Sequence, residues 1–292
     1  SEGRSLQSST GIAIGGVLNI ALDPLFMFVL LPPGQEVLGA GIATALSNGI
    51  ACLFFITVVL RMGKGSVVTF NPRAGLASKE SVIAVFAVGV PSAVATFLFD
   101  LDYVIIDKLM VSYHDLALAA VGIVLKVERF PLNVGVGICQ GMLPLVAYSY
   151  GAGNHRRMND TIRLARRVGL LIAAVSIVLY EIFAGPLVRI FLSDAQAVEM
   201  ASGFLRIRVL ATPLMFLSFF TVYLFQAFGR GRISLFLGVM RWLVFNIPML
   251  FILNHFFGMY GIVWSQVVAD SLTVLLSFYV LRRFGPKKEA VS

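Results

Sequence analysis

The stretch "LNIALDPLFMF", residues 18–28, places an aspartate and a proline inside a run of apolar residues. In the hydrocarbon core of a membrane an ionisable side chain costs at least about 2.5–3.5 kcal/mol, so such residues usually have a function. Only 13% of the 292 residues are charged and 58% are hydrophobic, whereas soluble domains carry about 25% charged residues. The composition therefore predicts an all-α polytopic membrane protein, with Asp23 inside its first span.

Apolar runs long enough to cross a bilayer, which takes about 20 residues per helix, occur eight times along the chain. The predicted spans are residues 11–31, 37–60, 82–106, 117–149, 168–192, 204–228, 233–257 and 259–281. The fourth run is too long for one straight span. Pro131 and Pro144 predict that it is kinked or extends beyond the bilayer.

The net charge of +8 is distributed as a topology signal and not as a nucleic-acid-binding patch. Most of the 23 Lys and Arg residues fall in loops on one side of the predicted spans, within residues 61–79, 156–167, 230–232 and 282–288. Cytoplasmic loops attract Lys and Arg. We therefore expect this side and the C-terminus to be cytoplasmic, with no nucleic-acid partner.

Two parts of the chain resemble each other in the order of their landmarks. Residues 3–4 and 229–230 are both Gly-Arg, and Pro24 matches Pro248 in a similar apolar context. The matching landmarks lie six predicted spans apart. Because six is even, both copies have the same orientation in the membrane, as in the parallel repeats of transporters. We expect twelve helices in two six-helix lobes, with the first four helices absent from this chain.

This repeat predicts how the chain is organised. Residues 1–60 form the last two helices of the N-terminal lobe, and residues 82–284 form the C-terminal six-helix lobe. Between them, residues 61–81 carry basic residues, Gly, Pro and Asn and form a cytoplasmic linker. Residues 285–292 form a cytoplasmic tail.

Three stretches resemble the multidrug and toxic compound extrusion (MATE) transporters. "LNIALDPLFMF" followed by "GAGIATALSN" is similar to helices five and six of that family, and "ICQGMLPLVAYSYGAGNHRRM" to the end of helix eight and the next cytoplasmic loop. The resemblance implies a V-shaped pair of six-helix bundles in the cell membrane, acting as a monomer. It implies export of organic cations or other amphiphiles by alternating access, driven by an inward proton or sodium gradient.

The resemblance also implies a cation site in the N-terminal lobe. Some members use an Asn and an Asp one turn apart on helix five with a Thr on helix six, and Asn19, Asp23 and Thr44 match these positions. The spacing of Asn19 and Asp23 independently puts them on one helical face, and Pro24 frees a backbone carbonyl one turn earlier. We interpret the group as a proton- or cation-coupling site. The alternative is that Asp23 only fixes helix packing.

The segment "FLFDLDYVIIDKLM", residues 97–110, holds Asp100 and Asp102. On a helix the two lie about 200° apart and cannot face one cavity. Other family members carry an acid on helix seven that either residue matches, although the span 204–228 has no acid to match a second one on helix ten. Substrate or coupling function and a packing role remain open for both.

Two further polar groups are candidates for the cavity. Lys126 and Arg129 share a helical face, either to compete with a proton or substrate for a carboxylate or to neutralise an acid inside the bundle. Gln266 and Asp270 begin a polar stripe on the last span, which either lines the cavity or packs against another helix.

The leading function is a cation-coupled antiporter of small amphiphilic or cationic substrates, with a proton or Na⁺ as the coupling ion and no other cofactor. A lipid-linked oligosaccharide or polysaccharide flippase of the same superfamily is the alternative. It needs several cations in the cavity, for which only Lys126, Arg129 and Arg241 are available. The sequence shows no clustered nucleophile, base or metal ligands, so we expect neither an enzyme nor a metal site.

Overall fold

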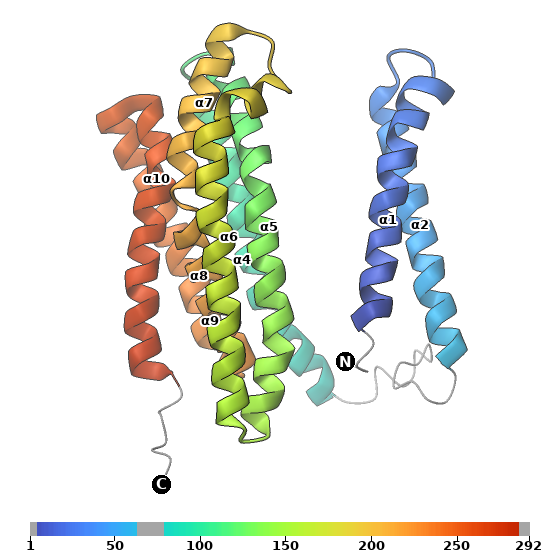
Figure 1. Ribbon diagram of the computed structural model, residues 1–292, viewed down its shortest axis with the longest axis vertical. Coiled ribbons are helices and arrows are strands. Elements are labelled where there is room, and N and C mark those ends of the chain that lie inside the picture. The colour runs from blue at the N-terminus through green and yellow to red at the C-terminus, as the bar shows by residue number, and fades with distance from the viewer. Residues whose placement is uncertain (1–4, 63–78, 286–292) are drawn as a thin grey trace. The chain divides into compact units, whose positions relative to one another are not determined.

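The computed structural model describes residues 5–62 and 79–285, and these residues are almost entirely helical (Figure 1). The chain divides into two compact units, Ser1–Val82 and Ile83–Ser292, which are described separately. Residues 63–78 of the predicted linker and residues 286–292 of the predicted tail lie outside the described residues.

The first unit is a pair of packed helices joined by a short turn. Its elements are α1 (Ser5–Pro24), the π-helical segment η1 (Leu25–Leu30) and α2 (Glu36–Met62). Gly34 makes the turn with a φ of 94°, which only glycine adopts readily. The backbones of α2 and η1 come close together at Gly39. A Cβ at this position would lie only 2.8 Å from the carbonyl oxygen of Phe26.

The second unit is a bundle of longer helices. Its elements are α4 (Lys79–Val111), α5 (Asp115–Gly151), α6 (His155–Arg189), α7 (Ala195–Val209), α8 (Thr212–Ala227), α9 (Gly231–Val239), the π-helical segment η3 (Met240–Asn246) and α10 (Ile247–Phe284). Side-chain caps fix three of the starts: His114, Asn154 and Asp194 each accept a hydrogen bond from the backbone three residues later, which satisfies an N–H group that the helix leaves free.

Five described helices are long and apolar enough to cross a membrane, or six if α7 and α8 form one bent span. The predicted span 204–228 is divided between these two helices, which meet at an angle of 44°. Pro213 lies in the first turn of α8, where a proline is tolerated but cannot continue an earlier helix. By contrast, α5 runs through Pro131 and Pro144 as one helix of 37 residues. At about 1.5 Å per residue it is about 56 Å long, well beyond the roughly 30 Å hydrocarbon layer.

The last two predicted spans form one helical run, Gly231–Phe284, that folds back on itself. Gly258 lies within α10 and interrupts it, with φ 59° and ψ −144°. Figure 1 shows the ribbon of α10 reversing its direction. Arg241 and Asp270, 29 positions apart in sequence, are therefore in direct contact. Both copies of the predicted repeat contain a π-helical segment beside the matched proline, η1 after Pro24 and η3 before Pro248.

The turn at Gly258 gives a first prediction. A Cβ on Gly261 would overlap the carbonyl oxygen of Leu253, whereas a Cβ on Gly122 would have nothing within 4 Å. Replacing Gly261 with alanine is expected to lower the free energy of unfolding by about 1–3 kcal/mol, as overpacking does. Gly122→Ala is the control and is expected to be neutral or slightly stabilising. Thermal unfolding of both variants in one detergent measures the difference, and equal midpoints would contradict the turn.

The core of the second unit consists of two main apolar clusters. One joins α4, α5, α6, α7 and α10 around Phe204, Leu205 and Leu250. The other joins α5, α6, α8, α9 and α10 around Phe225 and Leu237. The clusters hold the helices that carry the buried polar residues described below.

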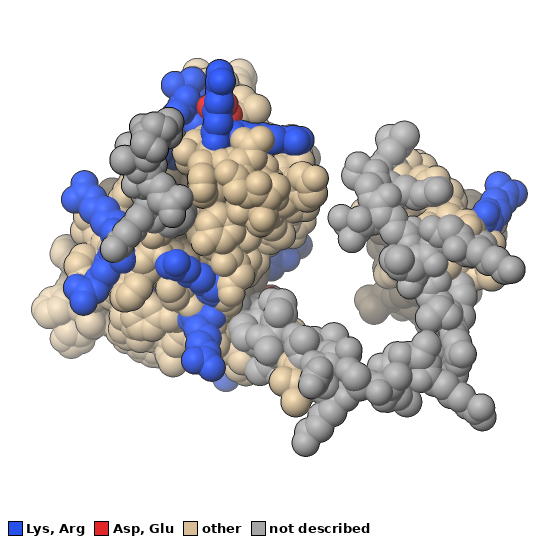
Figure 2. Space-filling model, turned by 90° about the horizontal axis from the view of Figure 1, so that it is seen from below, with Lys and Arg blue, Asp and Glu red and all other residues tan. Residues whose placement is uncertain are grey.

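Basic residues gather at one end of the second unit. The ends of α5 and α8 meet there, since the rings of Tyr150 and Phe228 are 5.1 Å apart, and Arg230 at the start of α9 donates to the carbonyl oxygen of Phe284 at the end of α10. Figure 2 views this end and shows Lys and Arg side chains spread over it with little acidic surface. The loops that the charge pattern assigned to one side thus lie together in this unit.

Candidate functional site

Asn19, Asp23 and Thr44, the predicted coupling residues, lie together in the first unit, and we call them the Asp23 cluster. The amide nitrogen Nδ2 of Asn19 donates to Oδ1 of Asp23 at 3.2 Å and to Oγ1 of Thr44 at 3.3 Å. The first contact spans one turn of α1, and the second joins α1 to α2. A single amide therefore connects the carboxylate to the neighbouring helix.

Helices α1 and α2 pack closely beside the Asp23 cluster. A Cβ on Gly15, one turn before Asn19, would lie 3.3 Å from the Cβ of Ala51 on α2. Beside it is an apolar groove of about 520 Å³ whose lining includes Asn48. Asn19 and Asp23 are half-buried, and Thr44 is exposed.

Among the described residues, Asp23 has no basic partner. Over residues 5–62 and 79–285 the ion pairs involve other acids. Oxygen ligands from a carboxylate, an amide and a hydroxyl suit a hard cation, and an unpaired carboxylate between apolar helices also suits a proton. The chemistry of the Asp23 cluster therefore suits either a proton or a hard cation.

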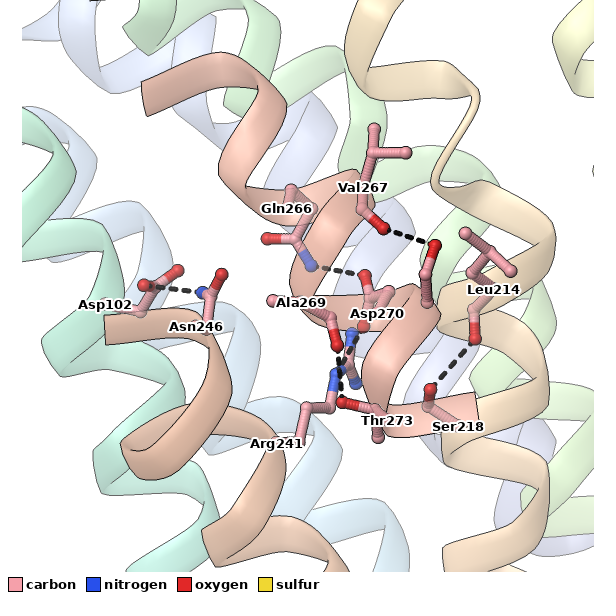
Figure 3. Close-up of polar contacts among 11 residues, drawn as sticks. Asp102, Leu214, Ser218, Arg241, Asn246, Gln266, Val267, Ala269, Asp270 and Thr273 are labelled. Carbon is pink, nitrogen blue, oxygen red and sulfur yellow. Dashed lines mark hydrogen bonds and ion pairs between the residues drawn. The ribbon is translucent and has the colours of Figure 1, made fainter. Parts of the chain in front are cut away.

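A second group of polar residues is buried in the second unit, and we call it the C-terminal network: Asp102, Arg241, Asn246, Gln266 and Asp270 (Figure 3). Nε of Arg241 contacts Oδ1 of Asp270 at 2.8 Å, and Gln266 donates to the other oxygen of the same carboxylate. Nδ2 of Asn246 donates to Oδ1 of Asp102 at 2.7 Å. All five side chains are nearly inaccessible, at 3% exposure or less.

The segment η3 links the two parts of the C-terminal network. It carries Arg241, which reaches α10, and Asn246, which reaches α4. Its seven residues follow π-helical geometry, which is rare and occurs frequently at functional sites. One donor and one acceptor of this network have no hydrogen-bond partner among the described residues: the buried Nη2 of Arg241 and the buried Oδ1 of Asn246.

A third buried contact joins α5 to α7. Arg208 donates from Nε and Nη2 to the two oxygens of Glu128, at 2.6 and 2.8 Å. Their side chains are 2% and 7% exposed. This two-pronged geometry is the strong form of an arginine–carboxylate pair, and it neutralises both charges inside the bundle.

The predicted cavity residues divide into two groups. Asp102, Gln266 and Asp270 belong to the C-terminal network, whereas Asp100, Lys126 and Arg129 are exposed on the second unit. Asp100 and Asp102 do face different surroundings, as their spacing predicts. The guanidinium of Arg129 lies 4.7 Å from the ring centre of Tyr103.

The sequence interpretation missed Glu128, Arg208 and Asn246, and it considered Arg241 only as a possible cavity cation of a flippase. We considered that Lys126 or Arg129 neutralises an acid inside the bundle. In the structure Arg208 neutralises Glu128 instead. The two residues are 80 positions apart in sequence, so spacing along one helix does not reveal the pair. A usable signal was present, since an acid and two arginines stood inside apolar runs and buried charges are normally paired. The sequence does not say which residues pair. Within the described parts of the chain, no group of three His, Cys, Asp or Glu side chains could hold a metal ion.

Comparison with known proteins identifies the family. The model of the MatE family matches residues 91–252. The chain belongs to the MatE family. The prediction of a MATE transporter and of a MATE-like all-α membrane fold is thereby confirmed.

Relatives and solved structures agree with this assignment. This MatE protein is 32% identical over 285 residues to the multidrug export protein MepA of Staphylococcus saprophyticus, a match that covers 97% of this chain and 62% of that protein. MepA of Staphylococcus aureus is 32% identical over 284 residues, covering 96% and 61%. The chain thus spans about three-fifths of the length of these relatives.

Solved structures support the fold. An outward-facing multidrug resistance MATE family transporter of the MOP superfamily has a TM-score of 0.83 and 22% identity, with 94% of this chain and 61% of that one covered. The Vibrio cholerae MATE transporter VcmN in its bent form has a TM-score of 0.78 and 22% identity, with 96% and 63% covered. At this identity the likeness concerns the fold of the MatE protein.

Proposed function

We propose that the protein exports multiple small amphiphilic or cationic drugs by alternating access, in exchange for an inward-moving proton or Na⁺ that binds at the Asp23 cluster. The observation that carries the proposal is the half-buried carboxylate of Asp23, held by Asn19 and lacking a basic partner among the described residues. The MepA relatives, named as multidrug export proteins, support the choice of cargo.

The Asp23 cluster supports exchange because its occupancy changes its charge. A carboxylate that takes up a proton or Na⁺ becomes neutral as a site, and the cost of holding it between apolar helices falls. Coupling requires that the ion favour one conformation over the other by differential binding. The bond from Asn19 to Thr44 supplies a route, because it ties the state of Asp23 to the contact between α1 and α2.

The charge pattern supports a cytoplasmic location for the basic end of the second unit and for the C-terminus. Arginines at the α5–α6 turn and at the end of α10 share this end, and cytoplasmic loops are enriched in Lys and Arg. Export from the cytoplasm would then begin at this face. We further propose that the protein works in the cell membrane as a monomer and needs only the coupling ion.

The flippase alternative receives less support from the structure. A pyrophosphate-linked substrate calls for several free cations, yet Arg208 and Arg241 are each engaged by a carboxylate. Lys126 and Arg129 are exposed on the second unit. The buried charges suit a site for weakly charged cargo better.

Vesicle transport tests the proposal. The protein encoded by the full open reading frame that contains residues 1–292 is purified and reconstituted into vesicles. Ethidium serves as a fluorescent organic cation. An imposed pH gradient and an imposed Na⁺ gradient are applied in turn. We expect ethidium movement under one of the two gradients and none without a gradient. Movement that is independent of both gradients would contradict coupled exchange.

A further inference from the structure

Helix α6 presents an exposed apolar face about as long as a bilayer core is thick. Its residues 168–180 carry no charge, and Leu164, Leu171, Val178 and Ile182 are each more than half exposed. Because they are spaced by seven, seven and four positions, they lie on one face of the helix. From Leu164 to Ile182 the helix rises about 27 Å, close to the roughly 30 Å of the hydrocarbon layer. This face is therefore placed to contact lipid acyl chains.

One end of the apolar face leads into a pocket of about 410 Å³ at the α5–α6 turn, which lies at the lower end of the second unit in Figure 1. The pocket is lined by Asn154, Arg156, Arg157, Asp160, Thr161 and Leu164. Leu164 belongs to both the pocket and the apolar face. Arg157 lies seven positions before Leu164, hence on the same side of the helix and about 10 Å further along its axis. A lipid whose chain lies along α6 thus has its headgroup close to this pocket.

Two arginines of the pocket are available to an anion. Arg156 and Arg157 are exposed, and among the described residues neither takes part in an ion pair. Arg163, by contrast, contacts Asp160 at 3.5 Å. Near an anionic lipid surface each Lys or Arg strengthens binding about fivefold. The pocket therefore combines two cations with an apolar wall, as an anionic phospholipid requires.

We propose that this pocket binds the headgroup of an anionic phospholipid, with the phosphate on Arg156 and Arg157 and an acyl chain along the exposed face of α6. The carboxylate of Asp160 disfavours a headgroup with several negative charges, but it accepts hydrogen bonds from hydroxyl groups. Phosphatidylglycerol, with a single negative charge and a glycerol headgroup, meets both conditions. The inference goes beyond the proposed export function and does not depend on it, because a lipid binds whether or not cargo moves.

Native mass spectrometry counts the lipids bound to a membrane protein and gives the affinity of the first. The protein encoded by the full open reading frame is titrated in one detergent with phosphatidylglycerol or phosphatidylcholine of identical acyl chains. The first phosphatidylglycerol is expected to bind about 25-fold more tightly than phosphatidylcholine, because each of two arginines contributes about fivefold. Free glycerol phosphate is expected to bind at least about tenfold more weakly than phosphatidylglycerol, since it makes no contact with the apolar face.

Three variants separate the pocket from the charge of the surrounding surface. Arg156→Gln combined with Arg157→Gln is expected to reduce the preference for phosphatidylglycerol to less than about twofold. The matched control, Arg282→Gln combined with Arg283→Gln, removes two exposed arginines at the same end of the unit and is expected to leave the preference unchanged.

The third variant addresses the apolar half of the site. Leu164→Asn is expected to weaken phosphatidylglycerol binding about fivefold and to leave glycerol phosphate binding unchanged, because only the lipid uses the apolar face. Leu164 is 65% exposed, so this variant still tests the site if the double arginine variant does not fold.

Equal affinities for phosphatidylglycerol and phosphatidylcholine would overturn the inference. An equal loss of preference in the two double variants would overturn it as well, since general charge attraction would then suffice. Equally tight binding of glycerol phosphate would make the pocket a free-phosphate site and overturn the lipid assignment. Lipid preference without gradient-driven ethidium movement would contradict the proposed export alone, and ethidium movement without lipid preference would contradict this inference alone.

Discussion

Replacing Asp23 with asparagine is expected to reduce gradient-driven ethidium movement to the level of protein-free vesicles. Asparagine keeps the size of the side chain and its hydrogen bond to Asn19, but it neither takes up a proton nor supplies a charged ligand to Na⁺. The loss would therefore come from coupling and not from folding. Ethidium fluorescence under each imposed gradient measures it.

The neighbours of Asp23 provide graded tests of the same cluster. Thr44→Val removes the acceptor that links Asn19 to α2 and is expected to reduce transport in part, since the carboxylate remains. Asp107→Asn, at an exposed acid on α4, is the matched control and is expected to transport normally. Full transport by Asp23→Asn would leave Asp23 with a packing role and direct attention to Asp102, a buried acid paired with a neutral side chain.

Breaking the buried pair between Glu128 and Arg208 is expected to give a large loss of stability in the second unit. Removing one partner of a buried ion pair leaves the other charge uncompensated and typically costs about 3–5 kcal/mol. Glu128→Gln is therefore expected to lower the free energy of unfolding by about that amount. Denaturant unfolding in a single detergent, monitored by the circular dichroism signal of the helices, measures the change in the free energy of unfolding.

The exposed pair of Arg206 and Glu181 is the natural control. Its atoms are 3.8 Å apart, with side chains 54% and 42% exposed, so Glu181→Gln is expected to change stability by less than about 1 kcal/mol. Replacing Glu128 and Arg208 together with methionine is expected to restore much of the loss, because no unpaired charge remains. Equal losses from Glu128→Gln and Glu181→Gln would contradict the buried pairing.

The sequence was informative where the interactions are local. Asn19 and Asp23 are one turn apart on a single helix, so their spacing alone predicted that they share a face. The family resemblance added Thr44 on the next helix, and the structure brings all three together. The helical character followed equally from composition, because a membrane leaves few other ways to satisfy backbone polar groups.

The C-terminal network was only partly predictable. Its contacts join residues 29 and 144 positions apart, and they depend on how α4, η3 and α10 pack. Gln266 and Asp270 were visible as a polar stripe, but their partner Arg241 is brought near by the reversal at Gly258. The bend between α7 and α8 was missed for a related reason, since a continuous apolar run hides a break that packing imposes.

The most direct test of coupled export records both fluxes in the same vesicles. Ethidium is added on one side while a pH-sensitive dye and a Na⁺-sensitive dye report the opposite movement of each ion. We predict that ethidium movement is accompanied by counterflow of one of the two ions, and that both fluxes vanish together in Asp23→Asn. Ethidium movement with neither ion moving, or ion counterflow that persists in Asp23→Asn, would contradict the account.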